Sequence, residues 1–459
     1  MLNLLSVTSV LSTIGSILLA ILVLLVMITV HEFGHYIVGK IFKFKINEFA
    51  IGMGPAIFKR QNKTTNEVFS IRVFPLGGFC AFEGEDEDSN SEGAFNNKEP
   101  YKRILVLISG ALMNLLLGIL VLTLSIGIYG QLLVRTYDIK PTDTPEYSGY
   151  SLENDDIILK IDGKSIFMAS DVADVLKGKN KGDVVTITVK TKSGNKDKLV
   201  RLRNDVNSDN LTDVISAFTA IGVSTISRID GVTNTSLFKQ NEYFLRFNNA
   251  TNYDDCTRIF EIGEVVSYAK TLSVGDVLSV YTTMGTNDTK RVVNAIITED
   301  LSLLTSDEVL QKLGITSNSV YLKYVTENVK FGFFQTIGRG FKYSFSVAGT
   351  IFKTLGELLT GKLGVEAVGG PVTTISVTSN AIKTGGFNYF LEIMGFIGVN
   401  LAVFNLLPIP ALDGSRVVFA VIEWIRKKPL NKKIEGVIHG VGLVVLLGFC
   451  ILVDLLKLF

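Results

Sequence analysis

The sequence contains few of the residues that build the commonest disulfide and metal sites. Of its 459 residues only three are cysteines, Cys80, Cys256 and Cys450, and their separation matches no metal-binding spacing. A disulfide scaffold and a cysteine-ligated zinc site are therefore excluded. Lysine and arginine total 45 against 44 acidic residues, a formal net charge of +1. The chain thus lacks the excess of positive charge that is typical of nucleic-acid-binding proteins, and we expect no nucleic-acid partner.

Charged residues are absent from four long stretches. None precedes Glu32, and none occurs in residues 104–134, 393–412 or 436–453. The hydrocarbon core of a bilayer takes about 20 apolar residues per helix. The stretches therefore predict four transmembrane helices and exclude a soluble enzyme. The first stretch lacks the basic segment that opens a signal peptide, so we expect a retained transmembrane helix there.

Lysine and arginine cluster beside particular ends of these stretches. They follow the first stretch at Lys40, Lys43 and Lys45, precede the second within residues 98–103, and separate the third from the fourth within residues 416–433. Cytoplasmic loops carry such an excess of positive charge. The pattern predicts a multi-pass protein of the plasma membrane, with both termini outside and the basic loops in the cytoplasm.

The long polar stretch from about residue 135 to residue 328 then lies on the outer side. Its alternating apolar residues predict β-strands. Residues 155–163 are echoed by residues 241–249, and Gly182-Asp183-Val184 is echoed by Gly275-Asp276-Val277. These echoes predict two diverged copies of one small β-rich module.

The segment that follows, residues 331–363, has apolar and basic residues at helical spacing. It predicts either an amphipathic helix on the membrane surface or an ordinary helix that packs against a domain.

The end of the first apolar stretch carries the pattern His31-Glu32-Phe33-Gly34-His35. Positions i and i+4 share one face of a helix, so both imidazoles can reach one metal with the glutamate beside it. Zinc suits this geometry, because a catalytic zinc ion keeps one coordination position for a water molecule and lowers the pKa of that water. Glu32 would take a proton from it. Ionisable groups in an apolar span are costly, which favours a functional site over two histidines that merely pack.

A catalytic zinc site of this kind needs a third protein ligand, often a carboxylate. The acidic residues near the membrane are Glu48, Glu392, Asp413, Glu423 and Asp454. Asp413 is the best candidate, because it ends an uncharged stretch that contains two prolines. The prolines break the helix and free backbone groups that are tolerated in lipid only where they line a protein cavity. The predicted topology also places Asp413 at the same depth as His31 and His35.

Together these segments resemble the site-2 protease family of intramembrane zinc metalloproteases, in particular its bacterial branch. The two principal matches are His31-Glu32-Phe33-Gly34-His35 and Asn405-Leu406-Leu407-Pro408-Ile409-Pro410-Ala411-Leu412-Asp413-Gly414. Further family motifs are matched by Phe49-Ala50-Ile51-Gly52-Met53-Gly54-Pro55, by Phe74-Pro75-Leu76-Gly77-Gly78-Phe79 and by Gly110-Ala111-Leu112-Met113-Asn114. The outer repeat resembles the family's tandem PDZ insert.

The resemblance implies a role for each matched residue. His31, His35 and Asp413 would be the zinc ligands, and Glu32 the general base. Asn405 would contact the substrate or the transition state, with helix packing as the alternative. Gly77 and Gly78, in a membrane-associated hairpin, would let an unwound substrate strand approach; the alternative is a plain surface turn.

The implied fold is a polytopic α-helical membrane protein with a cytoplasmic-side β-hairpin and an extracytoplasmic tandem PDZ-like α+β insert. The expected segments are residues 1–40 (first span), 41–102 (cytoplasmic loop with the hairpin), 103–134 (second span), 135–205 and 206–328 (the two PDZ-like modules), 329–384 (amphipathic helix and linker), 385–412 (third span), 413–434 (cytoplasmic loop with the third ligand) and 435–459 (fourth span). Two residues depart from the family pattern: Ser415 replaces a glycine, and Ala111 replaces a proline.

The implied activity is hydrolysis of peptide bonds within or near transmembrane segments of single-span proteins, such as anti-sigma factors or signal-peptide remnants. A first extracytoplasmic cut by a site-1 type protease would precede it. Two other functions stay open at this stage: an inactive membrane-anchored PDZ adaptor, and a zinc or ion transporter.

Overall fold

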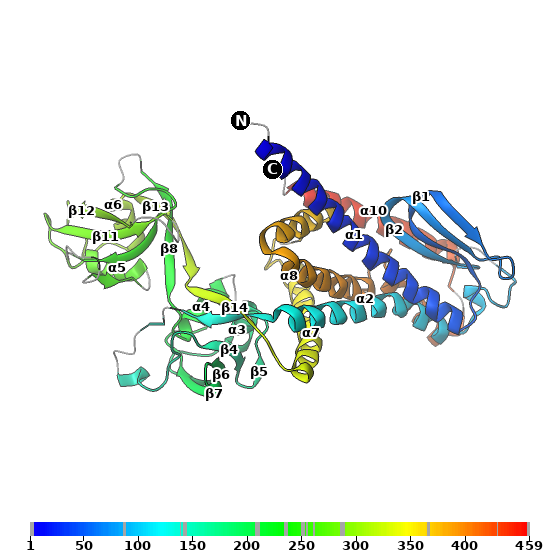
Figure 1. Cartoon of the computed structure of the whole chain (residues 1–459), viewed down its shortest axis with the longest axis horizontal. Helices are drawn as coiled ribbons and strands as arrows, with labels where there is room; N and C mark the ends of the chain where they lie inside the picture. Colours follow the sequence, from blue (N-terminus) through cyan, green and yellow to red (C-terminus); the bar gives the residue numbers. More distant parts are fainter. Residues whose placement is uncertain are drawn as a thin grey trace. The chain divides into compact units, whose positions relative to one another are not determined.

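The computed structural model describes residues 4–85, 89–137, 139–140, 145–206, 212–233, 237–248, 253, 256–259, 262–284, 290–364, 368–428 and 430–456. Residue 249, the last of the predicted second repeat copy, lies outside this set. The chain divides into two compact units (Figure 1). The first combines Met1–Gly130 with Lys330–Phe459, and the second is Gln131–Val329.

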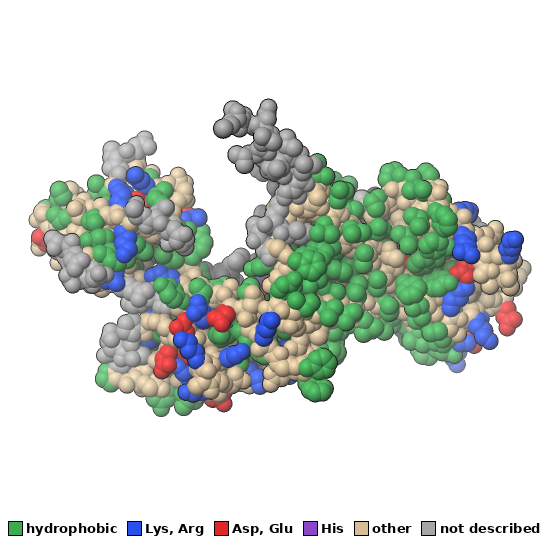
Figure 2. Space-filling view, in the orientation of Figure 1, with side chains coloured by type: hydrophobic (Ala, Val, Ile, Leu, Met, Phe, Trp, Pro, Cys, Tyr) green, Lys and Arg blue, Asp and Glu red, His purple; other side chains and the backbone are tan. Residues whose placement is uncertain are grey.

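Four helices of the first unit are long and apolar enough to cross a membrane. The helices that contain these spans are α1 (Leu4–Ile41), α2 (Pro100–Tyr129), α8 (Pro371–Leu406) and α10 (Lys432–Leu456). The backbone of α8 is interrupted at Gly386, whose φ is 66°, and only the segment after this kink qualifies as a span. Hydrophobic side chains cover much of the visible face of this unit (Figure 2). The chain is a multi-pass membrane protein with β elements.

The second helix ends earlier than the predicted limit of residue 134. Gly130 follows α2 with φ 90°, a conformation that an L-residue adopts only at a cost, and it terminates the helix. Residues after it form β3 (Gln131–Thr136), in which buried and half-buried residues alternate for most of its length. Uncharged residues at 131–134 therefore belong to a half-buried strand and not to the membrane helix.

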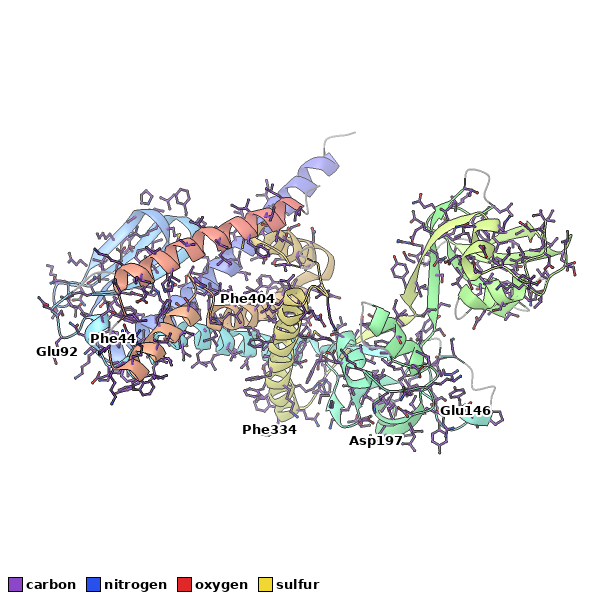
Figure 3. All side chains as sticks on the ribbon, turned by 180° about the vertical axis from the view of Figure 1, so that it is seen from behind. Phe44, Glu92, Glu146, Asp197, Phe334 and Phe404 are labelled. Atoms are coloured by element: carbon purple, nitrogen blue, oxygen red, sulfur yellow. The ribbon has the colours of Figure 1, made fainter. Side chains whose placement is uncertain are left out.

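Helix α7 (Phe333–Leu359) packs against α2 and α8. Gly340 lies so close to α2 that a Cβ there would be 2.8 Å from the Thr123 Cα atom, which shows the tightness of the contact. Large aromatic residues remain exposed elsewhere on α7, including Phe334 at 85% and Phe341 at 52% (Figure 3). Helix α7 therefore has one face packed against candidate membrane helices and other faces with exposed aromatic residues of the kind that a membrane-surface helix presents to lipid.

Between α1 and α2 the chain forms β1 (Ile46–Gln61) and β2 (Val68–Phe82). Both strands bend, so that residues 48–51 pair with residues 78–81 on one side and with residues 68–71 on the other. Residues 56–61 pair with the outer side of residues 68–72. This layer and the adjoining ends of α1 and α2 share an aromatic core that includes Phe44, Phe49, Phe82 and Phe95 (Phe44 is labelled in Figure 3).

The second unit contains two antiparallel sheets. The first has the strand order β14-β3-β4-β6-β7, with β5 beside β4. Its elements are β3, β4 (Ile157–Ile161), β5 (Lys164–Ser165), α3 (Ala169–Leu176), β6 (Val184–Thr191), β7 (Gly194–Arg201), α4 (Thr212–Ala220) and β14 (Tyr324–Val329). Its buried core extends from Val134 to Val223, so that α4 belongs to this module.

The other sheet has the strand order β12-β11-β9-β8-β13, with β10 beside β9. Its elements are β8 (Thr225–Val232), β9 (Tyr243–Phe247), β10 (Thr257–Arg258), α5 (Ile262–Ala269), β11 (Val277–Thr283), β12 (Arg291–Ile296), α6 (Ser306–Lys312) and β13 (Ile315–Leu322).

The two modules share one topology, because each strand and helix of the first has a counterpart at the same place in the second. The sequence echoes fall on equivalent elements, β4 with β9 and β6 with β11. Asp155 and Asn241, which precede the first of these pairs, have nearly equal positive φ angles of 70° and 68°. The chain completes the second module before β14 returns to pair with β3, so the second module is nested inside the first.

The start of α8 is capped by a side chain from α10. The Asp454 carboxylate accepts hydrogen bonds from the backbone N–H groups of Gly370, Val372 and Thr373 at 3.0–3.1 Å, and from the Thr373 hydroxyl at 2.7 Å. These N–H groups have no partner within their own helix, and an acidic side chain is favourable at a helix N-terminus. One carboxylate therefore joins the last helix to the first turn of α8.

We predict that Asp454→Ala lowers the free energy of unfolding by about 1–2 kcal/mol, because three backbone donors lose their acceptor. Asp454→Asn should lose less, since an amide oxygen still accepts at this position. Thermal unfolding of the full chain in detergent micelles measures both changes. Equal melting temperatures for Asp454→Ala and the parent would show that the cap does not hold α8.

Candidate metal centre

Helix α1 presents two histidines on one face near its end. His31 and His35 are one turn apart, both are 7% exposed, and their Nε2 atoms lie 3.1 Å from each other. Glu32 follows His31 directly and is largely buried. The helical spacing of the motif therefore produces the convergence that the sequence predicts for two metal ligands.

Asp413 arrives from a distant part of the chain. Helix α8 ends at Leu406, the following residues include Pro408 and Pro410, and α9 (Asp413–Arg426) begins at the carboxylate itself. The return of the chain is tight: a Cβ at Gly414 would lie 2.4 Å from the carbonyl oxygen of Leu406. Only glycine fits there, and it brings the first turn of α9 against the end of α8.

The three ligand atoms form a compact triangle. Asp413 Oδ2 lies 2.9 Å from His31 Nε2 and 3.3 Å from His35 Nε2, and the third side of the triangle is the 3.1 Å between the two nitrogens. Tetrahedral ligands at about 2.05 Å from a zinc ion are about 3.3 Å apart. The triangle therefore fits three corners of a zinc tetrahedron and leaves the fourth for water. Among the described residues this is the group of histidine, cysteine and acidic side chains that can hold a metal ion.

Helix α2 fixes the ring of His35. The Nδ1–H of His35 donates to the backbone carbonyl of Val106 at 2.8 Å. A proton on Nδ1 leaves Nε2 with a free lone pair, and partners of this kind orient metal-binding histidines. The ring also lies against Gly110, where a Cβ would be 2.5 Å from His35 Nε2 and 2.8 Å from His31 Cε1.

Two asparagines lie at the other nitrogen of His31. The side-chain nitrogen of Asn405 is 3.3 Å from His31 Nδ1, and that of Asn114 is 3.5 Å away. If His31 binds metal through Nε2, its Nδ1 carries the proton. Rotation of either asparagine amide group by 180° exchanges its nitrogen and oxygen, so that the oxygen accepts a hydrogen bond from this N–H group. Asn405, predicted to contact substrate, therefore lies beside a metal ligand. Asn114, the last residue of one matched family motif, lies there too.

Gly77 and Gly78 of the predicted hairpin have different neighbours. Gly78 is beside the general-base candidate, since a Cβ there would be 3.5 Å from Glu32 Cγ and 3.0 Å from the carbonyl oxygen of Ala50. Gly77 has φ 105° and lies against the Met53 side chain instead. The backbone N–H of Cys80 lies near the Glu32 carboxylate. Strand β2 therefore borders the metal centre at Gly78 and Cys80.

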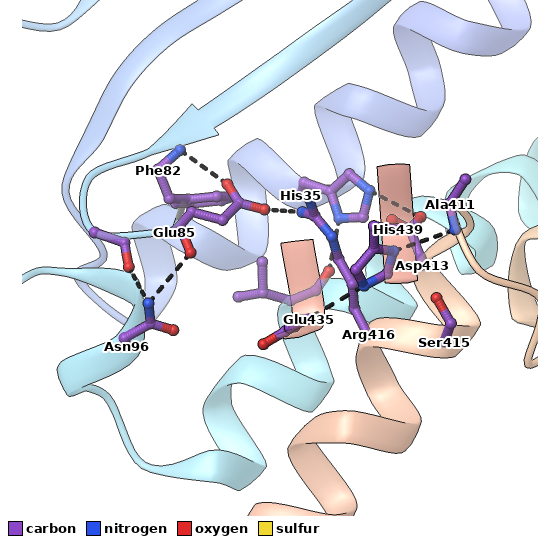
Figure 4. Close-up of polar contacts among 12 residues, drawn as sticks. His35, Phe82, Glu85, Asn96, Ala411, Asp413, Ser415, Arg416, Glu435 and His439 are labelled. Atoms are coloured by element: carbon purple, nitrogen blue, oxygen red, sulfur yellow. Dashed lines mark hydrogen bonds and ion pairs between the residues drawn. The ribbon is translucent and has the colours of Figure 1, made fainter. Parts of the chain in front are cut away.

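The loop that carries Asp413 has support that was not expected from the sequence. The backbone N–H of Ala411 donates to His439 Nδ1 of α10 at 3.2 Å, and Ala411 has the left-handed φ of 81° (Figure 4). Arg416, one turn after Asp413, forms an ion pair with Glu85 after β2. A histidine within an apolar span is the sequence signal that could have indicated the first of these contacts.

Ser415, which replaces a family glycine, fits the helix that begins at Asp413. Its hydroxyl donates to the carbonyl oxygen of Leu412 at 2.8 Å, and the side chain is 4% exposed. Its backbone N–H donates to the same carbonyl at 3.1 Å. The substitution thus adds a hydrogen bond at the first turn of α9 and leaves the position of Asp413 unobstructed.

We predict that Gly110→Ala lowers zinc affinity by about 10- to 100-fold, because the added methyl group displaces both imidazoles. Competition with a zinc chelator measures the affinity. Gly448→Ala is the matched control, since a Cβ at that helical glycine meets no atom within 4 Å. Unchanged affinity in Gly110→Ala would mean that the rings do not occupy these positions when metal is bound.

For His439 the expected effect is indirect. His439→Leu removes the acceptor of the Ala411 N–H group and should lower zinc affinity by about tenfold through the position of Asp413. Val441→Ala, at a position of α10 that is 59% exposed, should leave the affinity unchanged. The same chelator competition applies, and equal affinities for His439→Leu and Val441→Ala would contradict the supporting role of His439.

Comparison with known proteins agrees with this geometry. A model of peptidase family M50 matches residues 19–449. A protein from Fusobacterium nucleatum named as a candidate zinc metalloprotease is 26% identical over 441 residues, which cover 94% of this chain and 96% of the relative. The regulator of sigma E protease from Haemophilus influenzae is 27% identical over 466 residues, with 94% and 96% covered. The chain belongs to peptidase family M50, the site-2 protease family, and is an intramembrane zinc metalloprotease.

Proposed function

We propose that His31, His35 and Asp413 hold the catalytic zinc ion and that Glu32 is the general base of peptide hydrolysis. The observation that carries this proposal is the triangle of ligand atoms with sides of 2.9–3.3 Å. Glu32 lies beside this triangle and is not one of the ligands. A carboxylate in that place can exchange protons with a reacting water without competing for the metal.

When bound, zinc polarises the scissile carbonyl and lowers the pKa of the attacking water. Glu32 takes a proton from that water as it attacks the carbonyl carbon, and then gives the proton to the departing amine nitrogen. The backbone N–H of Cys80 lies near the Glu32 carboxylate. Asn405 and Asn114 orient His31 through its Nδ1 atom, which is a positioning role. Asn405 remains the residue that we propose also contacts substrate.

The substrate in this proposal is a single-span membrane protein whose helix unwinds locally. A helical amide is shielded by its own hydrogen bonds, so an extended strand must be presented to the site. Among the described residues, residues 78–81 of β2 pair with β1 along one edge only. The other edge can add a substrate strand by β-pairing, and Gly78 lets its backbone come close to Glu32.

We place the metal centre near the cytoplasmic side of the plasma membrane, with β1 and β2 on that side and residues 131–329 outside. The support is the lysine and arginine excess of the loops that precede α2 and follow α8. The nested outer modules are proposed to be PDZ-like filters. They would bind a new C-terminus or exclude intact ectodomains after a first cut by a site-1 type protease. Anti-sigma factors are suitable substrates, given the relative that regulates sigma E.

The two other functions have weaker support. An inactive PDZ adaptor would tolerate the loss of a ligand or of the base, and all four residues are present. A transporter would need no base beside its first histidine, whereas Glu32 occupies that position. Neither function therefore explains the arrangement as well as hydrolysis does.

We predict that Glu32→Gln retains one zinc ion per chain and lowers the cleavage rate of a membrane-embedded segment by about 10²- to 10⁴-fold. The amide has the shape of the carboxylate but cannot take a proton at neutral pH. Metal analysis and cleavage in reconstituted vesicles measure the two properties. Glu146→Gln, at an exposed position of the outer unit (Figure 3), is the control and should change neither.

Retained cleavage in Glu32→Gln would remove Glu32 from the mechanism. Loss of zinc in the same variant would instead make Glu32 a ligand. Zinc flux through vesicles that hold the parent protein would favour the transporter.

A further inference from the structure

A second pocket, away from the metal centre, lies between the start of α2 and the end of α9. Its volume is about 440 Å³, and its lining includes Lys98, Arg103, Trp424, Lys427 and Lys428. This volume falls within the range of small-molecule sites. Four of these five side chains carry a positive charge, so the pocket is suited to an anion.

Two carboxylates, Glu423 and Glu435, also line the pocket, against four basic side chains. Glu423 forms an ion pair with Arg103, and its other oxygen accepts the backbone N–H of Leu430 at 2.7 Å. Glu435 lies 3.9 Å from His439 Nε2. The pocket therefore keeps an excess of positive charge after its own carboxylates are counted.

Arg103 has donor capacity that the protein leaves unused. The residue is 8% exposed, and its Nε atom has no hydrogen-bond partner among the described residues. A buried donor without a partner is costly, and each such group in a native protein calls for an explanation. Glu423 pairs with only one end of this guanidinium. An anionic ligand in the pocket would compensate its charge.

The lysines are also placed unusually. Lys427 ends α9 with the left-handed φ of 52°, where glycine is the ordinary choice. Neither Lys427 nor Lys428 forms an ion pair with a described carboxylate, although both line the pocket. Both positive charges are therefore available to a ligand in the pocket.

The pocket lies at the level of the membrane surface. The candidate span Pro100–Tyr129 begins at one of its lining residues, and the span Lys433–Leu456 begins close by. Trp424 is 54% exposed, and its neighbour Ile425 is 76% exposed. Tryptophan is enriched at the boundary between lipid and water, and basic pockets between helices on the cytoplasmic side bind phospholipid head groups.

We propose that this pocket binds the phosphodiester head group of an anionic phospholipid of the cytoplasmic leaflet. The excess positive charge attracts the phosphate, and the exposed Trp424 and Ile425 face the acyl chains. An acidic protein segment is less suitable, because the pocket is small and opens among side chains suited to lipid. Free phosphate would gain nothing from the two apolar residues.

Trp424 makes the test direct, because it is the single tryptophan of the chain. The full-length protein is reconstituted in phosphatidylcholine vesicles, and a fixed fraction of the lipid carries bromine atoms, which quench nearby tryptophan fluorescence. One sample contains brominated phosphatidylglycerol, and the other contains brominated phosphatidylcholine at the same mole fraction. The ratio of quenching gives the relative affinity of the site for the anionic lipid.

We expect stronger quenching by the phosphatidylglycerol than by the phosphatidylcholine. The double variant Lys427→Gln/Lys428→Gln should lower the relative affinity by about 30-fold. The double variant Lys59→Gln/Lys63→Gln is the matched control, because it removes equal charge on the same predicted side, outside the pocket. It should keep the selectivity. Unchanged zinc content shows that each variant is folded.

Equal quenching by the two lipids would overturn the proposal. An equal loss of selectivity in the two double variants would also overturn it, because it would show that diffuse surface charge attracts the lipid. Two competitors separate the sources of the anion. Relief of quenching by millimolar inorganic phosphate would assign the pocket to a free anion, and relief by an acidic peptide would assign it to a protein segment. Selective quenching that neither competitor relieves supports the lipid.

Discussion

The metal centre depends on how closely three helices approach one another inside the membrane. Two imidazoles of α1 and a carboxylate that follows α8 can meet only if α2 leaves room between them. Glycines provide that room: Gly34 lies against the Ser109 carbonyl, Gly110 lies against both histidines, and Gly118 lies against Gly395 and Val399. In lipid, helices associate through such close packing, since the hydrophobic effect does not drive them together. The geometry of the proposed metal centre is therefore set by the same contacts that hold the helices.

The carboxylate must also be held at the end of a broken helix. Backbone groups released by Pro408 and Pro410 would be costly in lipid unless protein satisfies them. Ala411 donates to His439, Ser415 donates to Leu412, and Gly414 closes the turn against α8. The end of α8, the first turn of α9 and a side chain of α10 thus fix one oxygen atom. Burying Asp413 costs free energy, which its hydrogen bond with His31 and its contact with His35 offset.

Much of this architecture follows from local sequence patterns. Uncharged stretches locate the spans, the helical spacing of His31 and His35 brings two imidazoles together, and the echoes that begin at residues 155 and 241 lead into equivalent strands. Contacts between distant segments do not follow from such patterns. The return of β14 to β3 requires pairing across a whole module, and the support of Ala411 by His439 depends on how α10 lies against a loop. The end of α2 was placed too late, because an uncharged strand follows the helix directly.

The central claim is that one zinc ion is bound by two imidazole nitrogens and one carboxylate oxygen. X-ray absorption at the zinc edge tests it most directly on the purified full-length protein. We predict only nitrogen and oxygen neighbours of the zinc ion at about 2.0–2.2 Å, and loss of the bound ion in Asp413→Ala. A sulfur neighbour at about 2.3 Å, or an unchanged zinc spectrum in Asp413→Ala, would contradict it.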